Sequence, residues 1–228
     1  MNIRPAVLFS LVALAAFVPG RAESPLQTSR VPTRTQVAAR LSVCVFCGAS
    51  DQVAPKYAVA AQRLGEGIAA RHWTLVYGGS RTGLMGAVAR GAKDSGGRVV
   101  AVLPRFIQGW GVAYESADEL MTVTTMHERK LLLQARADAF VVLPGGSGTL
   151  DELADTLELD QLNLLGKPLI ILNQDGYYDG LLAFLDRAIS EKFSRDDLRQ
   201  KIQVVRTLDE ALGMLERLPG TSFARGAQ

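Results

Sequence analysis

The sequence predicts an α/β fold: a single Rossmann-like domain built on a doubly wound parallel sheet of about seven strands. From residue 41 onward, short apolar runs alternate with amphipathic stretches, an order typical of strands and helices in a parallel sheet. Most of the apolar runs are continuous in Val, Ile and Leu. The strands are therefore expected to be covered by helices on both faces.

The expected elements alternate regularly along the chain. The apolar runs predict strands at Ser42–Cys47, Thr74–Tyr77, Arg98–Leu103, Met121–Thr125, Ala139–Leu143, Pro168–Leu172 and Gln203–Val205. The amphipathic stretches predict helices at about Lys56–Arg71, Gly83–Ser95, His127–Arg136, Leu150–Leu164, Tyr178–Glu191 and Leu208–Leu218. Doubly wound sheets bind ligands beyond the carboxyl ends of their strands, so the loops that follow strands are expected to form the site.

Composition divides the chain into an N-terminal extension over residues 1–40, the domain over 41–218 and a C-terminal tail over 219–228. In the extension, a charged start, the apolar run Ala6–Val18 and the small-residue stretch Gly20–Ala22 are typical of a secretory signal. The apolar run is too short for a comfortable transmembrane helix, so no membrane partner is predicted. A misassigned start before a cytoplasmic protein is the alternative explanation.

Composition and charge are those of an ordinary globular protein, with 48% hydrophobic and 21% charged residues. The formal net charge is +2, but residues 1–40 carry five arginines and one acid, so the body has a slight excess of acid. A near-neutral body without a basic stripe gives no electrostatic reason to expect nucleic-acid binding. A small anionic ligand would need a local site.

Two cysteines, Cys44 and Cys47, have the C-x-x-C spacing of a redox pair. In an extended strand, however, residues three apart point to opposite faces, which is poor geometry for a disulfide. Both are therefore expected to be buried core thiols. No metal site is predicted, because two thiols cannot form a four-cysteine site and only His72 and His127 could add ligands.

Loops at the predicted strand ends carry the residues of interest. The first strand leads into Gly48-Ala49-Ser50, the second into Gly78-Gly79-Ser80 and the fifth into Pro144–Thr149. Glycine lets the backbone approach a ligand, and the helix that follows a glycine loop presents free N–H groups to an anion. The two glycine-rich loops, after the second and the fifth strand, fit neither the dinucleotide pattern nor the Walker A pattern. A tight turn would explain one such loop, but several at one sheet edge favour a phosphate site.

Charged residues beside two of these loops allow two interpretations each. Thr149 and Glu152 have the T-x-x-E spacing of a capping box, in which Glu152 would accept from the Thr149 N–H. Arg129 and Lys130 lie near a predicted helix start, where cations oppose the helix dipole. They form either a solvated helix face or the cationic start of a ligand-binding helix.

Two motifs carry a resemblance to a known family. Pro144–Glu152 has the form P-G-G-x-G-T-x-x-E, and Met126–Lys130 has the form M-H-x-R-K. In this order and separation they resemble the LOG (Lonely guy) family, the cytokinin riboside 5′-monophosphate phosphoribohydrolases, long labelled "possible lysine decarboxylase". The resemblance runs from about Val43 to about Leu218.

The resemblance implies an enzyme, a hydrolase that cleaves the N-glycosidic bond of AMP or of an N6-isoprenoid AMP into free base and ribose 5-phosphate. It also implies a Rossmann-like homodimer that needs neither cofactor nor metal, with Arg129 and Glu152 as the catalytic pair. A nucleotide substrate favours the cytoplasm, where nucleotide pools are, whereas the signal-like start favours export.

The resemblance further implies which residues hold the substrate. The phosphate segment corresponds to Gly145, Gly146, Ser147, Gly148 and Thr149, a second nucleotide-contacting loop to Gly78, Gly79 and Gly83–Gly86, and Lys130 and Ser50 are further binding candidates. One departure is Ser80, where the family often has a third glycine, so an altered loop geometry without lost activity is expected. Another is Leu131-Leu132-Leu133, where plant-like members often have a more polar sequence, which bears on the fit of an isoprenoid tail.

These residues can perform the chemistry that the resemblance implies. Cleavage of an N-glycoside develops positive charge on the ribose and negative charge on the departing base. Glu152 could stabilise the ribose cation, hold the ribose hydroxyls or orient water. Arg129 could bind either the departing purine or the phosphate, and both roles stay open.

Three other functions are alternatives, and one of them, a purely structural dimeric scaffold, would leave the glycine loops unexplained. A non-catalytic nucleotide or cofactor carrier on the same fold would not need the pair Arg129 and Glu152. A decarboxylase would need pyridoxal phosphate on a lysine, and none of the lysines has a setting typical of such a site.

Overall fold

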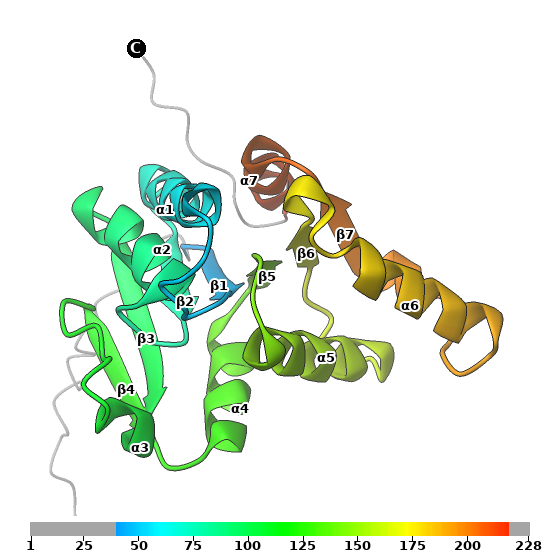
Figure 1. The fold of residues 1–228 in the computed structure, drawn as a ribbon, viewed down its shortest axis with the longest axis horizontal. Coiled ribbons are helices and arrows are strands. Elements are labelled where there is room, and N and C mark those ends of the chain that lie inside the picture. Colours follow the sequence, from blue (N-terminus) through cyan, green and yellow to red (C-terminus); the bar gives the residue numbers. More distant parts are fainter. Residues whose placement is uncertain (1–39, 219–228) are drawn as a thin grey trace, which may run out of the picture. The chain divides into compact units, whose positions relative to one another are not determined.

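The computed structural model describes residues 40–218, which form a seven-stranded parallel sheet with helices on both faces (Figure 1). They belong to the unit Ala38–Gln228. The predicted α/β fold class is confirmed. The signal-like segment and the predicted C-terminal tail lie outside the described residues.

The sheet has the order β4-β3-β2-β1-β5-β6-β7, and every neighbouring pair is parallel. The strands are β1 (Ser42–Phe46), β2 (Thr74–Tyr77), β3 (Arg98–Pro104), β4 (Glu119–Val123), β5 (Ala139–Val142), β6 (Leu169–Leu172) and β7 (Ile202–Val205). The order reverses between β1 and β5, which pair from Val43↔Ala139 to Phe46↔Val142. Such a switch point opens a crevice beyond the carboxyl ends of the two strands.

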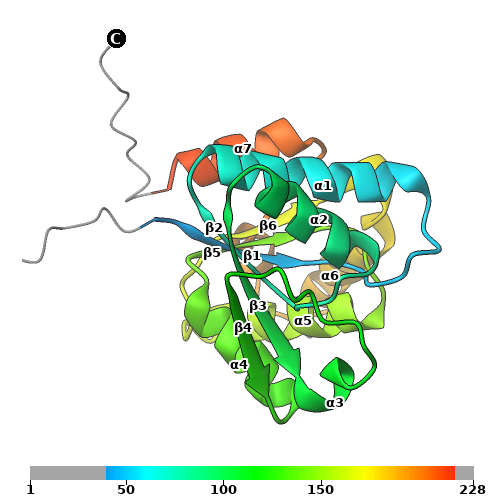
Figure 2. The ribbon, with the colours of Figure 1, turned by 90° about the vertical axis from the view of Figure 1, so that its left-hand side faces the viewer.

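Helices α1, α2 and α7 cover one face of the sheet, and α4, α5 and α6 cover the other (Figure 2). Their bounds are α1 (Pro55–Ala70), α2 (Gly83–Asp94), α3 (Arg105–Gln108), α4 (Met126–Arg136), α5 (Ser147–Gln161), α6 (Asp179–Ser190) and α7 (Leu208–Glu216). Short 3-10 turns lie at Gln174–Gly176 and Leu198–Lys201. Within residues 40–218, no helix is long and apolar enough to cross a membrane.

Alternate residues of each strand enter two separate hydrophobic clusters, one on each face of the sheet. The two cysteines fall on opposite sides in this way: Cys44 packs with Phe46 and Phe140, and Cys47 packs with the opposite cluster. Both thiols are free and buried, as predicted, and burial raises the pKa of each. Neither forms the redox pair that the spacing suggested.

One predicted strand is displaced along the chain, and one short helix was not predicted. Strand β4 begins at Glu119, two residues before the apolar run, because this edge strand is partly exposed and Glu119 pairs with Arg98 and Arg136, each at 3.0 Å. It ends early because the N–H groups of Thr124 and Thr125 donate to the Glu128 carboxylate in the capping box that starts α4. Helix α3 was not predicted.

Candidate active site

A pocket of about 470 Å³ lies at the switch point, beyond the carboxyl ends of β1 and β5. The β1 loop contributes Cys47, Gly48, Ala49, Ser50 and Val53, α1 and α2 contribute Tyr57, Leu84 and Met85, and α4 contributes Arg129. The β5 loop and α5 contribute Pro144, Gly145, Gly146, Ser147, Gly148, Thr149 and Glu152, and Tyr177 completes the wall. The structure thus brings the predicted catalytic pair together with six of the nine predicted binding residues: Ser50, Gly145, Gly146, Ser147, Gly148 and Thr149.

The phosphate segment predicted from the sequence forms the N-terminus of α5 at this pocket. Gly146 is the N-cap and supplies no side chain, so nothing from the cap covers the first N–H groups of the helix. These unpaired N–H groups and the helix dipole favour an anion. The loop is tied to β1 by the Gly48 N–H, which donates to the Pro144 carbonyl at 3.1 Å. Ser50 also lines the pocket.

Gly145 is packed so closely that it has no room for a side chain. A Cβ there would clash with Thr149 Oγ1 and lie 2.6 Å from Thr149 Cβ and 2.9 Å from the Gly48 nitrogen. We expect Gly145→Ala to push the loop away from β1 and to destabilise the protein by about 1–3 kcal/mol, the usual cost of overpacking. Thermal denaturation measures this, with Gly180→Ala in α6 as control, because a Cβ there meets no atom within 4 Å. Equal melting temperatures for both variants would contradict it.

Arg129 from α4 and Glu152 from α5 form a buried ion pair at the wall of the pocket. Arg129 Nη1 lies 2.9 Å from Glu152 Oε1, and the side chains are 7% and 3% exposed. The two groups are close but not aligned for a hydrogen bond, and Oε1 has no hydrogen-bond partner within residues 40–218. The guanidinium is instead anchored by Nε donating to the Val102 carbonyl (3.2 Å) and Nη2 donating to the Gly78 carbonyl (3.3 Å).

Burial raises the pKa of Glu152 from its ordinary 4.5 to about 7, because desolvation disfavours the carboxylate. The positive charge of Arg129 lowers this pKa, the negative charge of Asp151 raises it, and the positive charge of Lys130 lowers it. A carboxyl group with a pKa near neutrality, facing a pocket beside a fixed cation, is suited to proton transfer or to stabilising a developing positive charge.

The capping-box interpretation of Glu152 is wrong. Helix α5 begins at Ser147, three residues earlier than predicted, so Thr149 lies inside the helix and Glu152 lies in its second turn. The two capping boxes that the described residues contain start other helices, at Thr125 with Glu128 and at Thr207 with Glu210. The Glu152 carboxyl is therefore not used to cap a helix.

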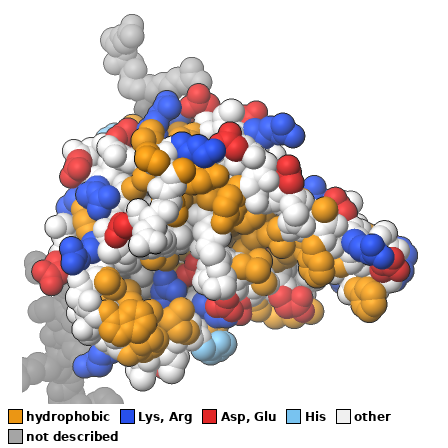
Figure 3. All heavy atoms as spheres, in the orientation of Figure 1, with side chains coloured by type: hydrophobic (Ala, Val, Ile, Leu, Met, Phe, Trp, Pro, Cys, Tyr) orange, Lys and Arg blue, Asp and Glu red, His pale blue; other side chains and the backbone are white. Residues whose placement is uncertain are grey.

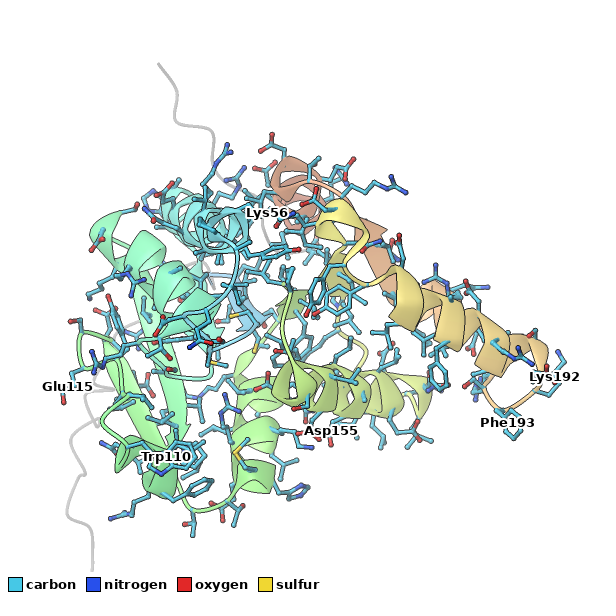
Figure 4. All side chains as sticks on the ribbon, viewed as in Figure 1. Lys56, Trp110, Glu115, Asp155, Lys192 and Phe193 are labelled. Carbon is cyan, nitrogen blue, oxygen red and sulfur yellow. The ribbon has the colours of Figure 1, made fainter. Side chains whose placement is uncertain are left out.

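Lys130, predicted to contact the substrate, does not line the pocket. Its Nζ lies 2.9 Å from Asp151 Oδ1 and 3.1 Å from Asp155 Oδ1, so α5 supplies it with two carboxylates (Asp155 is labelled in Figure 4). Gln134 Nε2 also donates to Asp155, at 2.6 Å. Lys130 thus joins α4 to α5 beside the Arg129–Glu152 pair, and the cations at the start of α4 are balanced by acids from α5.

The second glycine loop contacts Arg129, because the Gly78 carbonyl accepts a hydrogen bond from its guanidinium. Neither Gly78 nor Gly79 lines the pocket. A Cβ on Gly78 would clash with Arg129 Nη2, so the absence of a side chain there makes room for the guanidinium. Gly79 has φ +82°, whereas Ser80 is not in the left-handed region, so the serine in place of a third glycine creates no backbone strain. The Ser80 hydroxyl lies 2.9 Å from Thr82 Oγ1.

Sequence reasoning missed the aromatic wall of the pocket. Tyr57 from α1 and Tyr177 from the β6–α6 turn meet edge to face, with ring centroids 5.8 Å apart. The Tyr177 hydroxyl donates to the Gly145 carbonyl at 2.8 Å. The dipeptide Asp175-Gly176 predicts a turn at this place, but no pattern in the sequence predicts that the turn reaches the glycine loop.

The chain is similar to proteins of one known family over most of its length. The family model described as "Possible lysine decarboxylase" matches residues 85–215. "Probable cytokinin riboside 5′-monophosphate phosphoribohydrolase LOGL9" of Oryza sativa subsp. japonica is 47% identical over 151 residues, 66% of this chain and 66% of that protein. "Cytokinin riboside 5′-monophosphate phosphoribohydrolase LOG2" of Arabidopsis thaliana is 39% identical over 174 residues, 76% of this chain and 82% of that protein.

The chain belongs to the LOG family. Among solved structures, the molybdenum cofactor carrier protein of Chlamydomonas reinhardtii is similar, with a TM-score of 0.61 and 22% identity over 78% of this chain and 98% of that one. At this identity the likeness shows the fold alone. The decarboxylase label of the LOG family model has no support at this pocket, where none of the described lining residues is a lysine.

Proposed function

We propose that this LOG-family protein hydrolyses the N-glycosidic bond of adenine-type nucleoside 5′-monophosphates, releasing the free base and ribose 5-phosphate, as a cytokinin-activating enzyme does. The observation that carries the proposal is the buried pair Arg129–Glu152, which shares one pocket with the N-terminus of α5. The names of the relatives supply the substrate class. A carrier on the same fold would have no use for such a pair.

In the proposed mechanism Glu152 acts on the ribose. Its Oε1 accepts no hydrogen bond within residues 40–218 and is paired there only with the charge of Arg129, so a ribose hydroxyl or the attacking water can donate to it when substrate is bound. The carboxylate form would stabilise the oxocarbenium-like ribose electrostatically, and the low local dielectric makes this interaction strong. The proton released by the water would pass to Glu152, whose raised pKa suits it to accept one. The departing base would take up one proton from solvent, and Glu152 would return its proton to solvent before the next turnover.

Arg129 is proposed to act on the departing base. The Nε–Nη2 edge of its guanidinium donates to the carbonyls of Val102 and Gly78. This edge is therefore not available to bind a phosphate with two parallel hydrogen bonds. Nη1 carries two protons and donates to neither carbonyl, so beside Glu152 it can still donate one of them to a purine nitrogen as negative charge develops there. The phosphate is left to the N–H groups at the start of α5, where its binding energy positions the ribose.

The proposal is tested by incubating residues 40–218 or the full chain with AMP and with isopentenyl-AMP and separating the products by chromatography. Release of adenine or isopentenyladenine together with ribose 5-phosphate is the expected result. The ratio of the two rates identifies the preferred substrate. Tight binding of either nucleotide without base release would instead favour a carrier.

We expect the activity to rise with pH along an acid limb with a midpoint near 7, because the mechanism needs Glu152 as the carboxylate and burial raises its pKa to about 7. Two neighbouring charges should move this midpoint in opposite directions. Asp151→Asn removes a negative charge that raises the pKa of Glu152, so the midpoint should fall. Lys130→Met removes a positive charge that lowers this pKa, so the midpoint should rise. Profiles of kcat/KM against pH measure both shifts, and a midpoint that neither variant moves would belong to the substrate phosphate instead.

We also propose that the protein is a homodimer. Exposed apolar side chains gather over α5 and α6, where Figure 3 shows a band of them, and a second copy of the chain would cover this surface. The most exposed of them, in α6 or just after α5 and α6, are Leu162, Leu164, Phe184 and Phe193, at 56%, 70%, 66% and 87%. Light scattering after gel filtration measures the mass, and a monomer at micromolar concentration would contradict the proposal.

A cytoplasmic location is proposed, since the substrate class is found in the cytoplasm. The segment that would direct export lies outside the described residues. Fractionation of cells that express the full chain with a C-terminal tag tests this, and recovery of a shortened protein outside the cytoplasm would show that the N-terminus is a signal.

A further inference from the structure

Four consecutive carbonyl groups of the β5–α5 loop each accept a hydrogen bond. The Leu143 carbonyl accepts from the Tyr178 hydroxyl at 2.7 Å, and the Pro144 carbonyl accepts from the Gly48 N–H at 3.1 Å. The Gly145 carbonyl accepts from the Tyr177 hydroxyl at 2.8 Å, and the Gly146 carbonyl accepts from the Leu150 N–H at 3.0 Å. Each oxygen is thereby held in one direction.

One of these four bonds constrains the peptide that is easiest to rotate. The Gly145–Gly146 peptide joins two residues without a Cβ, so no side chain of its own opposes its rotation. Rotation would exchange the places of the Gly145 carbonyl and the Gly146 N–H, and it would turn a partial negative charge toward the anion site. The hydrogen bond from Tyr177 opposes that rotation, because it is lost when the carbonyl turns.

We propose that Tyr177 is a positioning residue that fixes the Gly145–Gly146 peptide in the orientation in which the loop binds the substrate phosphate. The inference rests on the proposed function only in naming the anion as a 5′-phosphate. Tyr177 would act through the peptide and not on the reacting atoms, since it makes no hydrogen bond to Arg129 or Glu152.

The tyrosine itself is held by its surroundings. Its ring meets Tyr57 edge to face and also meets Tyr178 edge to face, with centroids 5.0 Å apart in the second pair. The turn before it contains two left-handed residues, Asp175 (φ 54°) and Gly176 (φ 74°). Asp175 pairs with Lys56 at 2.8 Å, which ties the turn to the start of α1 (Lys56 is labelled in Figure 4).

The adjacent tyrosine provides a matched control. Tyr178 also donates its hydroxyl to a carbonyl of this loop, but the acceptor belongs to Leu143, before the glycines. Tyr178 is 6% exposed and does not line the pocket, whereas Tyr177 is 45% exposed and does. Both Tyr→Phe substitutions remove one hydroxyl and one hydrogen bond, so they differ in which peptide is released.

The test compares Tyr177→Phe and Tyr178→Phe in the full chain, with inorganic phosphate as the probe. Calorimetric titration should show a roughly tenfold weaker phosphate affinity in Tyr177→Phe, the size expected for losing one hydrogen bond that orders the site. The KM for the nucleotide should rise by a similar factor while kcat stays within about twofold. Tyr178→Phe should lower the melting temperature and leave phosphate affinity unchanged, since the buried Leu143 carbonyl loses its partner.

Unchanged phosphate affinity in Tyr177→Phe, equal weakening in both variants, or no phosphate binding by the wild type would overturn the inference. The titration needs no turnover, so it separates this inference from the proposed function. If the wild type releases no base but binds phosphate more tightly than Tyr177→Phe, the hydrolase proposal fails and the role of Tyr177 stands.

Discussion

Glu152→Gln should reduce base release by about a thousandfold or more while the protein stays folded. The substitution keeps the shape of the side chain but removes the carboxylate that would stabilise the ribose cation and accept a proton, effects that are each worth about two to four powers of ten. Turnover of AMP and isopentenyl-AMP measures the loss. The KM should change much less than kcat, because the phosphate is bound by other groups.

A second glutamate of the same helix gives the control. Glu158 lies on the exposed side of α5, so Glu158→Gln removes the same charge from the same helix outside the pocket. Its activity should equal that of the wild type. If Glu152→Gln retained a tenth or more of wild-type turnover, Glu152 would have no part in the chemistry, and a carrier would become the better explanation of the pocket.

Arg129→Lys should also abolish most of the turnover, although it keeps the positive charge. A lysine ammonium cannot reach the carbonyls of Val102 and Gly78 and the Glu152 carboxylate in the geometry of a planar guanidinium. We expect a loss of about a hundredfold in kcat, the usual effect of removing one oriented donor. Arg129→Ala should be worse for stability as well, because it leaves a buried carboxylate without its counter-ion.

Melting temperatures separate these two effects of Arg129. Arg136→Ala, at the exposed end of α4, removes an arginine that pairs with Glu119 at the surface and should change neither turnover nor stability by much. Full activity in a folded Arg129→Lys protein would show that only the charge is needed. The mechanism would then lose its directed hydrogen bond to the departing base.

The fold could be predicted because its strands are buried on both faces and therefore stand out as continuous apolar runs. The placement of Arg129, Glu152 and the glycine loop in one pocket follows from the same pattern, since strand-end loops meet at one sheet edge. The edge strand β4 was misplaced, because its first residue is a charged Glu119 held by ion pairs that only the fold creates.

Three features of the site could not be predicted: the start of α5, the partners of Lys130 and the contact of Tyr177 with Gly145. The T-x-x-E pattern resembles a capping box, yet α5 starts earlier, at Ser147, because the preceding glycine can serve as N-cap without a side chain. The partners of Lys130 come from one face of α5, and Tyr177 reaches Gly145 from a turn 32 positions later in the chain. Local patterns carry no information on such pairings.

The burial of Glu152 also couples activity to the unfolding equilibrium. Between its ordinary pKa of 4.5 and its folded pKa of about 7, the folded protein binds a proton that the unfolded chain has lost. This group's contribution to stability is therefore fully present below pH 4.5 and is lost as the pH rises through 7, by on the order of 3 kcal/mol. Denaturant titrations at pH 5 and 8 should show this decline in the wild type and a smaller one in Glu152→Gln. The same ionisation that switches the enzyme on thus makes its native state easier to unfold.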